Sequence, residues 1–430
     1  MRVQLAWTML TEIMVTVAGI LLLKLAVSLL GPAGFGEYTL TRRAVGLLYL
    51  PLVMGLGIAA PRYIAIARAG ALDGYSERSF ARAALAAGLL PALAAVLLMN
   101  AQPEWSAIVL FGTTSLSRLV PPATLALAGI ALHSMVYAIY RGRSQMGFAN
   151  LLQLVNLGII PVAAFALAPH DAAAVLSTTG AAWLVTSGIA FPHVFFREHD
   201  SRTGIAGTVS TREHLLLLLR FGLPRVPGEF ALVGLFAIPA LIALRAHGVV
   251  VAGQFSAAMS VLAMASGMFA PVGLVVLPRA SAQAATRDMD GLRRLVLGIL
   301  GGGILLAAMV VVVGELLIPT FIHWYFGAAF APAIPIFRAC LLGTIPFAVY
   351  ILMRSVLDAL DVKAVNSRNL LITLAVLVSL CLFDSGIMWM ALSLVGSLTL
   401  LGGLTLWDTY LRLRPVVDPI RSPASGPAIE

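Results

Sequence analysis

The chain has 430 residues, of which 60% are hydrophobic and only 11% are charged, and its formal net charge is +9. A water-soluble domain carries about 25% charged residues, so this composition excludes an ordinary soluble domain and favours helices that satisfy their backbone inside a bilayer. The basic residues lie in short segments between apolar runs, which is typical of cytoplasmic membrane loops and does not indicate nucleic-acid binding.

Apolar runs of about 20 residues predict membrane-spanning helices along the whole chain. The first run carries Glu12 and Lys24 and has no clear cleavage site, so it is interpreted as a helix and not as a signal peptide. Residues 101–118 are broken by Pro103 and Gly112 and are expected to form a loop at the outer face. The twelve predicted helices cover residues 5–30, 41–61, 80–99, 119–140, 147–168, 173–196, 214–244, 250–276, 293–318, 333–357, 366–383 and 386–411.

A sequence pattern repeats after 217 residues. Gly36-Glu37-Tyr38, placed after a predicted Gly/Pro turn, matches Gly253-Gln254-Phe255, and Pro61-Arg62 matches Pro278-Arg279. Phe111-Gly112 and Phe326-Gly327 form a further pair at nearly the same offset. Because duplicated halves are common in secondary transporters, we expect two six-helix bundles around a central cavity. Their pseudo-two-fold axis should run along the membrane normal.

The predicted domains follow from this duplication. We expect an N-terminal bundle over 1–196, a cytoplasmic linker over 197–213, a C-terminal bundle over 214–411 and a disordered cytoplasmic tail over 412–430. With the N-terminus in the cytoplasm, most of the 28 Lys and Arg residues fall on the cytoplasmic side, as the positive-inside rule requires. Both termini are therefore predicted to be cytoplasmic.

Catalytic motifs are absent from the sequence. It contains no GxxxxGK[ST] phosphate loop, no HExxH pair and no GxSxG elbow. The two cysteines, Cys340 and Cys381, lie in apolar runs without metal-ligand spacing. We therefore expect no enzymatic activity, no metal and no cofactor other than a coupling Na⁺ or H⁺.

Charges within the apolar runs are the informative residues, because a charge at the bilayer centre costs about 3 kcal/mol and usually faces a cavity or a partner. Lys24 lies deep in the first predicted helix and is either a snorkelling interfacial residue or part of a cationic wall. Arg42 and Arg43 are predicted to begin the second helix on the outer side, either as a solvated rim or as a phosphate site at the outer mouth.

The start of the seventh predicted helix carries a further charged pair. Arg225 and Glu229 are one turn apart among Pro224, Pro227 and Gly228, which predicts a bent or broken helix. The pair is either an intrahelical ion pair or part of a site. Glu229 also lies 217 residues after Glu12, so both carboxylates are expected to face the central cavity, where they either hold the cationic residues in place or bind a coupling Na⁺ or H⁺. The alternative is that they are two unrelated interfacial residues.

The runs LLGPAGFGEYTL and GLGIAAPRYIA resemble the opening of the polysaccharide transporter, or O-antigen flippase, family of the multidrug/oligosaccharidyl-lipid/polysaccharide exporter superfamily. Tyr140-Arg141-Gly142 with Asn150-Leu151-Leu152-Gln153, and the segment 354–369, are similar to two helix junctions of that family. The resemblance implies movement of undecaprenyl-diphosphate-linked glycans across a bacterial inner membrane. It also implies cationic residues in the cavity, for which Lys24, Arg42, Arg43 and Arg225 are the candidates.

In addition, the resemblance implies membrane lipids and other polysaccharide assembly proteins as partners. One feature departs from the family: near Arg245 only the basic member of an acidic-basic pair is present. Two alternatives remain open. A multidrug exporter of the same superfamily would favour an acidic cavity, and a glycan polymerase or ligase would need a larger outer loop than any predicted here.

Overall fold

The computed structural model describes residues 2–68, 74–168, 170–196, 209–270, 288–360 and 365–413, with four single positions between 271 and 287. Every regular element in these ranges is a helix, which confirms the predicted all-α class. Three predicted features lie outside the described residues: linker residues 197–208, the Pro278-Arg279 copy of the repeat, and the tail from residue 414.

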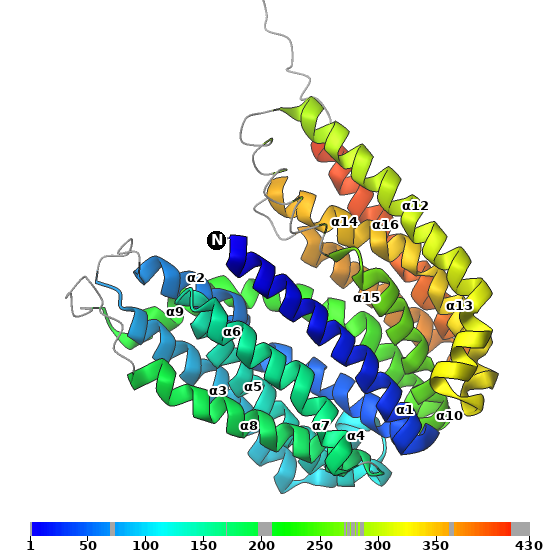
Figure 1. Ribbon diagram of the computed structural model, residues 1–430, viewed down its shortest axis with the longest axis horizontal. Helices are drawn as coiled ribbons and strands as arrows, with labels where there is room; N and C mark the ends of the chain where they lie inside the picture. The colour runs from blue at the N-terminus through cyan, green and yellow to red at the C-terminus, as the bar shows by residue number, and fades with distance from the viewer. Residues whose placement is uncertain are drawn as a thin grey trace, which may run out of the picture.

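The helices follow each other with short connections (Figure 1). The N-terminal half contains α1 (Arg2–Val53), α2 (Leu56–Arg68), α3 (Glu77–Ala101), α4 (Pro103–Phe111), η1 (Thr114–Leu119), α5 (Val120–Gly142), α6 (Met146–Gln153), η2 (Leu154–Ile159), α7 (Ile160–Leu167) and α8 (Ala172–Phe196). The C-terminal half contains α9 (Thr211–Gly222), η3 (Leu223–Arg225), α10 (Val226–Gly267), α12 (Met289–Phe321), η4 (Ile322–Phe326), η5 (Ala328–Ala333), α13 (Ile334–Leu342), α14 (Thr344–Leu360), α15 (Val365–Phe383) and α16 (Ile387–Leu413).

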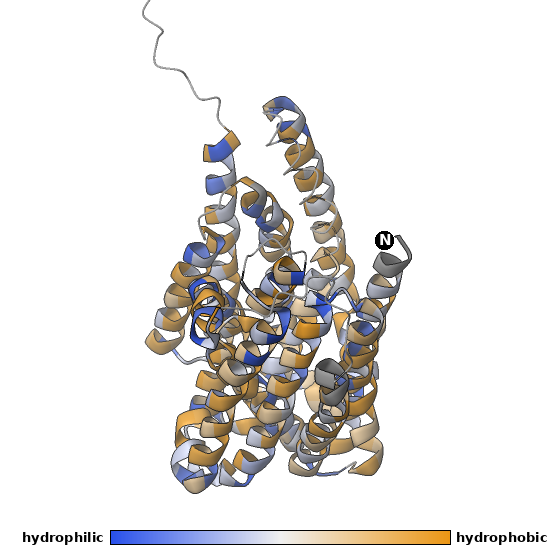
Figure 2. Ribbon diagram, turned by 90° about the vertical axis from the view of Figure 1, so that its left-hand side faces the viewer, coloured by the Kyte–Doolittle hydropathy of each residue, from blue (hydrophilic) through white to orange (hydrophobic). Residues whose placement is uncertain are grey.

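The described residues contain 10 helical stretches that are long and apolar enough to cross a membrane. Hydrophobic residues cover most of the helix lengths in Figure 2. Two of the stretches, Trp7–Val53 and Thr211–Gly267, have 47 and 57 residues and are too long for a single crossing. Each is two spans joined at a glycine, which reconciles the 10 stretches with the twelve predicted helices.

The two joining glycines have the same backbone geometry. Gly31 in α1 has φ 67° and ψ 179°, and Gly248 in α10 has φ 78° and ψ 177°. They lie 217 residues apart, the offset of the sequence repeat. A positive φ is readily adopted only by glycine, so one residue turns the chain without a loop. Each kinked helix therefore has a first arm before its glycine and a second arm after it.

The predicted boundary of the second helix is wrong for this reason. The second arm of α1 begins directly after Gly31, with Pro32 in its first turn, where a missing N–H costs nothing. Gly36-Glu37-Tyr38, expected to follow a loop, lies inside this helix. Residues 101–118 also differ from the predicted loop, because they form α4 and η1 and bury Leu110 and Phe111.

The two halves pack against each other where α1 meets α10, a contact surface that we call the seam. Backbones approach closely there: a Cβ on Gly253 would lie 2.7 Å from the Cα of Gly36, and one on Gly36 would collide with the carbonyl of Val249. Glycines at equivalent positions of the repeat thus face each other across the seam. A hydrophobic core that includes Phe35 from α1 and Phe255 from α10 is shared by both halves.

Away from the seam each half has its own core. One cluster combines residues of α2, α3 and α5, including Phe80 and Ile139. A second combines residues of α12 and α14, including Leu292 and Met353. In Figure 1 the ribbons of the two halves diverge toward the end where the N-terminus lies and meet near α1, α4 and α10. The core that includes Phe35 and Phe255 therefore lies at the end where the ribbons meet.

Helix α9 begins the C-terminal half in sequence but packs on the N-terminal half. Its Leu218 is buried in the core of α2, α3 and α5. His214 is fully buried, accepts a hydrogen bond at Nε2 from the Ser76 N–H at 3.2 Å and packs edge-on against Phe80. The break predicted at the two prolines is confirmed as the 3₁₀ turn η3, which separates α9 from α10. We call this turn the hinge.

Candidate functional site

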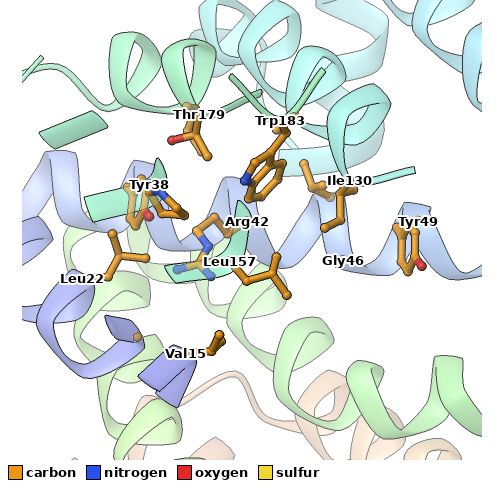
Figure 3. Close-up of a pocket in the computed structure, with 15 residues that line it drawn as sticks. Val15, Leu22, Tyr38, Arg42, Gly46, Tyr49, Ile130, Leu157, Thr179 and Trp183 are labelled. Carbon is orange, nitrogen blue, oxygen red and sulfur yellow. The ribbon is translucent and has the colours of Figure 1, made fainter. Parts of the chain in front are cut away.

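A cavity of about 350 Å³ lies inside the N-terminal half, between the two arms of α1 and the helices α5, η2, α7 and α8. Its walls are mostly apolar, as the valine, leucine and isoleucine side chains in Figure 3 show. The polar side chains that line it are Tyr38, Arg42, Tyr49, Thr179 and Trp183. Arg42 is the one charged residue of the lining, so a single positive charge dominates the field in this cavity.

Arg42 lies at the middle depth of its helix. It is midway between Gly31 and Val53, the ends of the second arm of α1. An arm of this length rises about 33 Å, close to the thickness of the hydrocarbon core. The expectation that Arg42 and Arg43 begin a helix is therefore wrong, because the arm starts some three turns earlier than predicted. Both arginines lie near the middle of this arm, far from either of its ends.

The Arg42 guanidinium has no ion-pair partner within 4 Å in the described part of the chain. It lies 5.5 Å from the ring centroid of Tyr38, one turn earlier on the same arm, and its side chain is exposed to the cavity. Arg42 also has a side-chain hydrogen bond with Tyr38. With this one neutral partner, the guanidinium keeps most of its five N–H donors for an incoming acceptor.

Arg43 points away from this cavity and into the seam. Its Nη1 donates to the Phe236 carbonyl at 2.6 Å, and its Nη2 donates to the Ser256 carbonyl at 2.9 Å. The hydroxyls of Ser256 and Ser260 accept further bonds at 2.5 and 3.3 Å. All of these acceptors belong to α10, so Arg43 binds one half to the other and is not free to bind a substrate in this conformation.

Lys24 also crosses the seam. Its Nζ donates to the carbonyls of Trp324 and Tyr325 at 2.8 and 2.6 Å, at the C-terminal end of η4. The Tyr325 hydroxyl in turn donates to the Ile20 carbonyl. Helix C-termini attract cations because their last carbonyls carry partial negative charge. Lys24 therefore caps the C-terminal end of η4 in the opposite half. This contact differs from both interpretations of the sequence, a snorkelling interfacial residue and part of an open cationic wall.

A reciprocal contact runs in the other direction. Arg245 of α10 donates from Nη2 to the Val109 carbonyl at 3.4 Å, near the C-terminal end of α4. That helix ends at Phe111-Gly112, the repeat partner of Phe326-Gly327, and both glycines have positive φ. Each half thus sends a basic residue from a first arm to the end of a short helix of the other half.

The two carboxylates proposed for ion coupling have different surroundings. Glu12 is exposed and accepts a hydrogen bond from Gln153 Nε2 at 2.9 Å. Glu229 is half-buried and has no ion-pair partner within 4 Å in the described residues, although it lies in the electrostatic field of Arg354 and Arg225. They occupy equivalent positions of the two first arms, but Glu12 bonds within its own half whereas Glu229 also interacts electrostatically with Tyr49 of the N-terminal half.

A buried polar ladder, which the sequence analysis missed, continues from Glu12. Amide side chains at every third residue of α6 and η2 face other helices: Asn150 donates to Thr8 at 3.1 Å, and Gln153 donates to Glu12. Asn156 follows, fully buried, in the π-helical turn η2. Asn156 Nδ2 lies 2.9 Å from His133 and donates to Ser187 at 3.0 Å. The spacing N-x-x-Q-x-x-N in an apolar run was the available signal.

Arg225 lies in the hinge and contacts an aromatic ring. Its guanidinium is 3.8 Å from the ring centroid of Phe221, and its Nη1 donates to the Phe221 carbonyl at 2.6 Å. Arg62 of α2 approaches the same ring at 4.5 Å. The Arg225–Glu229 ion pair, one of the two interpretations of this segment, does not form within 4 Å in the described structure. Arg62 was assigned to a loop in the sequence analysis and was not recognised as a partner of Arg225.

A second, apolar hollow lies on the C-terminal half between α10, α12 and α13, with a volume of about 390 Å³. We call it the apolar groove; its lining includes Val261, Leu317, Phe321, Trp324 and Leu341. Trp324 is 74% exposed, so the groove opens at the side of the helix bundle. Its lining contains no charged residue. The described residues contain no group of three His, Cys, Asp or Glu side chains suited to a metal ion.

Comparison with known proteins identifies the family and the fold. The family model described as polysaccharide biosynthesis protein matches residues 4–283. No curated protein matches the chain. Among solved structures, an inward-facing multidrug resistance MATE family transporter of the MOP superfamily aligns with a TM-score of 0.74 and 18% identity, covering 92% of this chain and 94% of that chain.

Two further structures show the same fold. An outward-facing multidrug resistance MATE family transporter aligns with a TM-score of 0.67 and 16% identity, covering 96% of this chain and 94% of that chain. A MOP superfamily transporter from Pyrococcus furiosus aligns with a TM-score of 0.66 and 14% identity, with the same coverage. That structure is described as having a binding pocket of reverse polarity that suggests a different function.

Proposed function

The chain belongs to the polysaccharide biosynthesis protein family, and from this premise we propose that it flips lipid-linked glycans across a membrane. Family and fold make it a multi-pass membrane transporter. The proposed substrate is an undecaprenyl-diphosphate-linked oligosaccharide that serves as a precursor of O-antigen, capsule or exopolysaccharide. The proposed direction is from the cytoplasmic to the outer leaflet of a bacterial inner membrane, with both termini in the cytoplasm.

The observation that carries this proposal is Arg42, which has no ion-pair partner in the described residues and lies in the cavity at the middle of a membrane-spanning helix arm. An isolated charge there costs about 3 kcal/mol on insertion scales, so a cation without a carboxylate partner calls for an anionic ligand. A diphosphate supplies charge-assisted acceptors that match the planar guanidinium. A cationic drug would instead be repelled by this charge, which is the main argument against a multidrug exporter.

The lipid tail of such a substrate needs an apolar path. The apolar groove has no charged lining residue and opens at the side of the bundle, where an isoprenoid chain can remain in contact with the bilayer. Its Trp324 carries the carbonyl that binds Lys24, so the groove adjoins the seam. A charged cavity combined with a lateral apolar groove suits an amphipathic lipid better than a compact soluble substrate.

Transport by alternating access requires the seam to open while the opposite ends of the halves close. In the present conformation the seam is closed by Lys24, Arg43 and Arg245, which all donate to neutral acceptors of the other half. Opening exposes these cations together. We propose that Lys24 and Arg43 then join Arg42 in stabilising the diphosphate, so the seam contacts and the substrate contacts alternate.

Ion coupling is proposed to use Glu12 and Glu229 with H⁺ or Na⁺. The polar ladder connects Glu12, through Gln153 and Asn156, to the helix that contributes Leu157 to the cavity. A change in the charge of Glu12 would therefore alter the hydrogen bonding and the electrostatic potential at the cavity wall. Glu229 lies beside the hinge, where its charge would bias the angle between α9 and α10.

The test is a proteoliposome assay with an undecaprenyl-diphosphate-linked sugar, in which accessibility of the sugar to an external lectin or oxidant reports translocation. Wild-type protein should translocate this lipid and leave a cationic drug such as ethidium untransported. The Lys24→Ala and Arg42→Ala variants should both be impaired. Drug transport without glycan transport would establish the multidrug exporter instead, and unchanged rates in both variants would refute the assigned role of the cations.

A further inference from the structure

Two guanidinium groups from different halves of the chain meet on one aromatic ring at the hinge. Arg62 comes from α2 and approaches the Phe221 ring centroid to 4.5 Å, while Arg225 comes from η3 and approaches it to 3.8 Å. Phe221 lies on α9, which packs against the N-terminal half. The arrangement therefore spans the junction between the two bundles, at the end opposite the seam.

The backbone holds this arrangement in place independently of the arginines. A Cβ on Gly222 would lie 2.5 Å from the Met54 carbonyl, so the α1–α2 junction and the α9–η3 junction touch without room for a side chain. Met54 and Gly55 both have positive φ, which turns the chain sharply at this contact. Tyr63 packs edge-on against Phe221 at 5.8 Å. The ring that carries the two cations is thus fixed from both sides.

Neither guanidinium forms an ion pair here, although Glu229, one turn after Arg225, interacts with it electrostatically from a longer distance. No carboxylate lies within 4 Å of the Arg62 or Arg225 guanidinium in the described part of the protein. Arg225 uses one N–H on the Phe221 carbonyl. Arg62 is exposed and has no protein acceptor among the described residues, so most of the ten N–H donors of the pair are available. Two like charges on one ring repel each other unless an anion lies between them.

We propose that Arg62 and Arg225 form a docking site for a phosphate-bearing lipid headgroup, which engages there before it moves to Arg42. The inference rests on the proposed function. Planar guanidinium groups recognise phosphate oxygens in pairs, and a diphosphate presents oxygens on two phosphorus atoms, one for each arginine. Because one arginine belongs to the N-terminal half and the other to the hinge, the bound headgroup also ties the hinge to α2.

The experiment measures translocation against substrate concentration in proteoliposomes made of neutral phosphatidylcholine. Arg62→Gln and Arg225→Gln should each raise the KM for the diphosphate-linked sugar about tenfold, since a charge-assisted contact is worth roughly that factor. The maximal rate should change much less, because the site acts before the translocation step. Arg62→Lys should recover part of the loss, and inorganic pyrophosphate should inhibit the wild-type protein more strongly than Arg62→Gln.

Arg82→Gln is the matched control, because Arg82 is an exposed arginine of α3 with the same charge and should leave the KM unchanged. If wild-type protein translocates the lipid and both Arg62→Gln and Arg225→Gln keep the wild-type KM, the docking site is refuted while the proposed function stands. Repeating the assay in vesicles that also contain phosphatidylglycerol distinguishes the substrate headgroup from bulk anionic lipid as the source of the phosphate. A substrate site keeps the difference between wild-type and Arg62→Gln in both membranes, whereas loss of that difference in neutral membranes would assign the site to bulk anionic lipid and overturn the proposal.

Discussion

The two halves of the chain share their backbone geometry and differ in their charges. Gly31 and Gly248 turn the chain identically, and Gly36 and Gly253 face each other across the seam. The equivalent of Arg42, by contrast, is Met259, which is completely buried. Duplication therefore preserved the positions where only glycine fits, because those positions determine how the helices pack. Charges were free to diverge, and the cationic cavity exists in the N-terminal half.

The seam shows the same contrast on a smaller scale. Arg43 and its repeat equivalent, Ser260, lie at matching positions of the two second arms and are donor and acceptor of one hydrogen bond. Two identical arginines at these positions would repel each other near the middle of the membrane. A divergence from arginine to serine converts this repulsion into a contact between the halves.

The largest expected effect comes from breaking the shared backbone geometry. Gly36→Leu and Gly253→Leu should each destabilise the protein by about 3 kcal/mol or prevent folding, because a side chain at either position meets the backbone of the other half. Thermal unfolding in detergent, followed by size-exclusion chromatography, measures this. Gly57→Ala is the control, since a Cβ there meets no atom within 4 Å. Equal loss of stability in Gly57→Ala would show that close packing at the seam is not the cause.

The difference in charge between the halves predicts the next largest effect. Arg42→Gln should reduce glycan translocation by about 30- to 100-fold, because the loss of a charge-assisted contact to phosphate costs about 2–3 kcal/mol. Arg42→Lys should retain part of the activity. Met259→Leu, at the equivalent position of the other half, should leave the rate unchanged. The same rate loss in both halves would contradict a site confined to the N-terminal cavity.

The carboxylates at equivalent positions of the two halves, Glu12 and Glu229, also differ in exposure and in partners. Glu229→Gln should reduce gradient-driven translocation about tenfold, since Glu229 is half-buried beside the hinge and lacks an ion-pair partner in the described structure. Glu12→Gln should have a smaller effect because its side chain is exposed and can still bond Gln153. Translocation is compared with and without an imposed H⁺ or Na⁺ gradient. Wild-type gradient-driven rates in both variants would refute the proposal that Glu12 and Glu229 couple transport to an ion.

The reciprocal seam contacts predict the smallest effect. Lys24→Gln and Arg245→Gln should each weaken the closed seam by about 1 kcal/mol, the scale of a cation at a helix C-terminus, and together should act additively. Spin labels on Glu104→Cys and Asp384→Cys, in a background without Cys340 and Cys381, should report a larger fraction of long distances. Arg118→Gln is the control, because Arg118 pairs with Glu37 and Asp171 of its own half. Unchanged distances in the double variant would refute the seam as a gate.

The sequence was sufficient to predict the class, the number of spans and the position of the repeat. Apolar runs define spans because only helices satisfy the backbone in lipid, and the glycine-containing motifs revealed the duplication. The sequence analysis placed Arg42 and Arg43 at a helix start, however, because it assigned several residues to a turn that Gly31 makes alone. That error moved two charges from the middle of a helix to its start.

The partners of the charged side chains could be found only in the folded chain. Lys24, Arg42 and Arg43 look alike in sequence, yet one caps a helix of the other half, one faces a cavity and one lies in the seam. Arg62 and Arg225 are separated by more than a hundred residues and share one ring. Local sequence determines where a helix runs, since its hydrogen bonds are internal to the segment. Which group a side chain meets depends on how distant helices pack, and that is decided only by the tertiary structure.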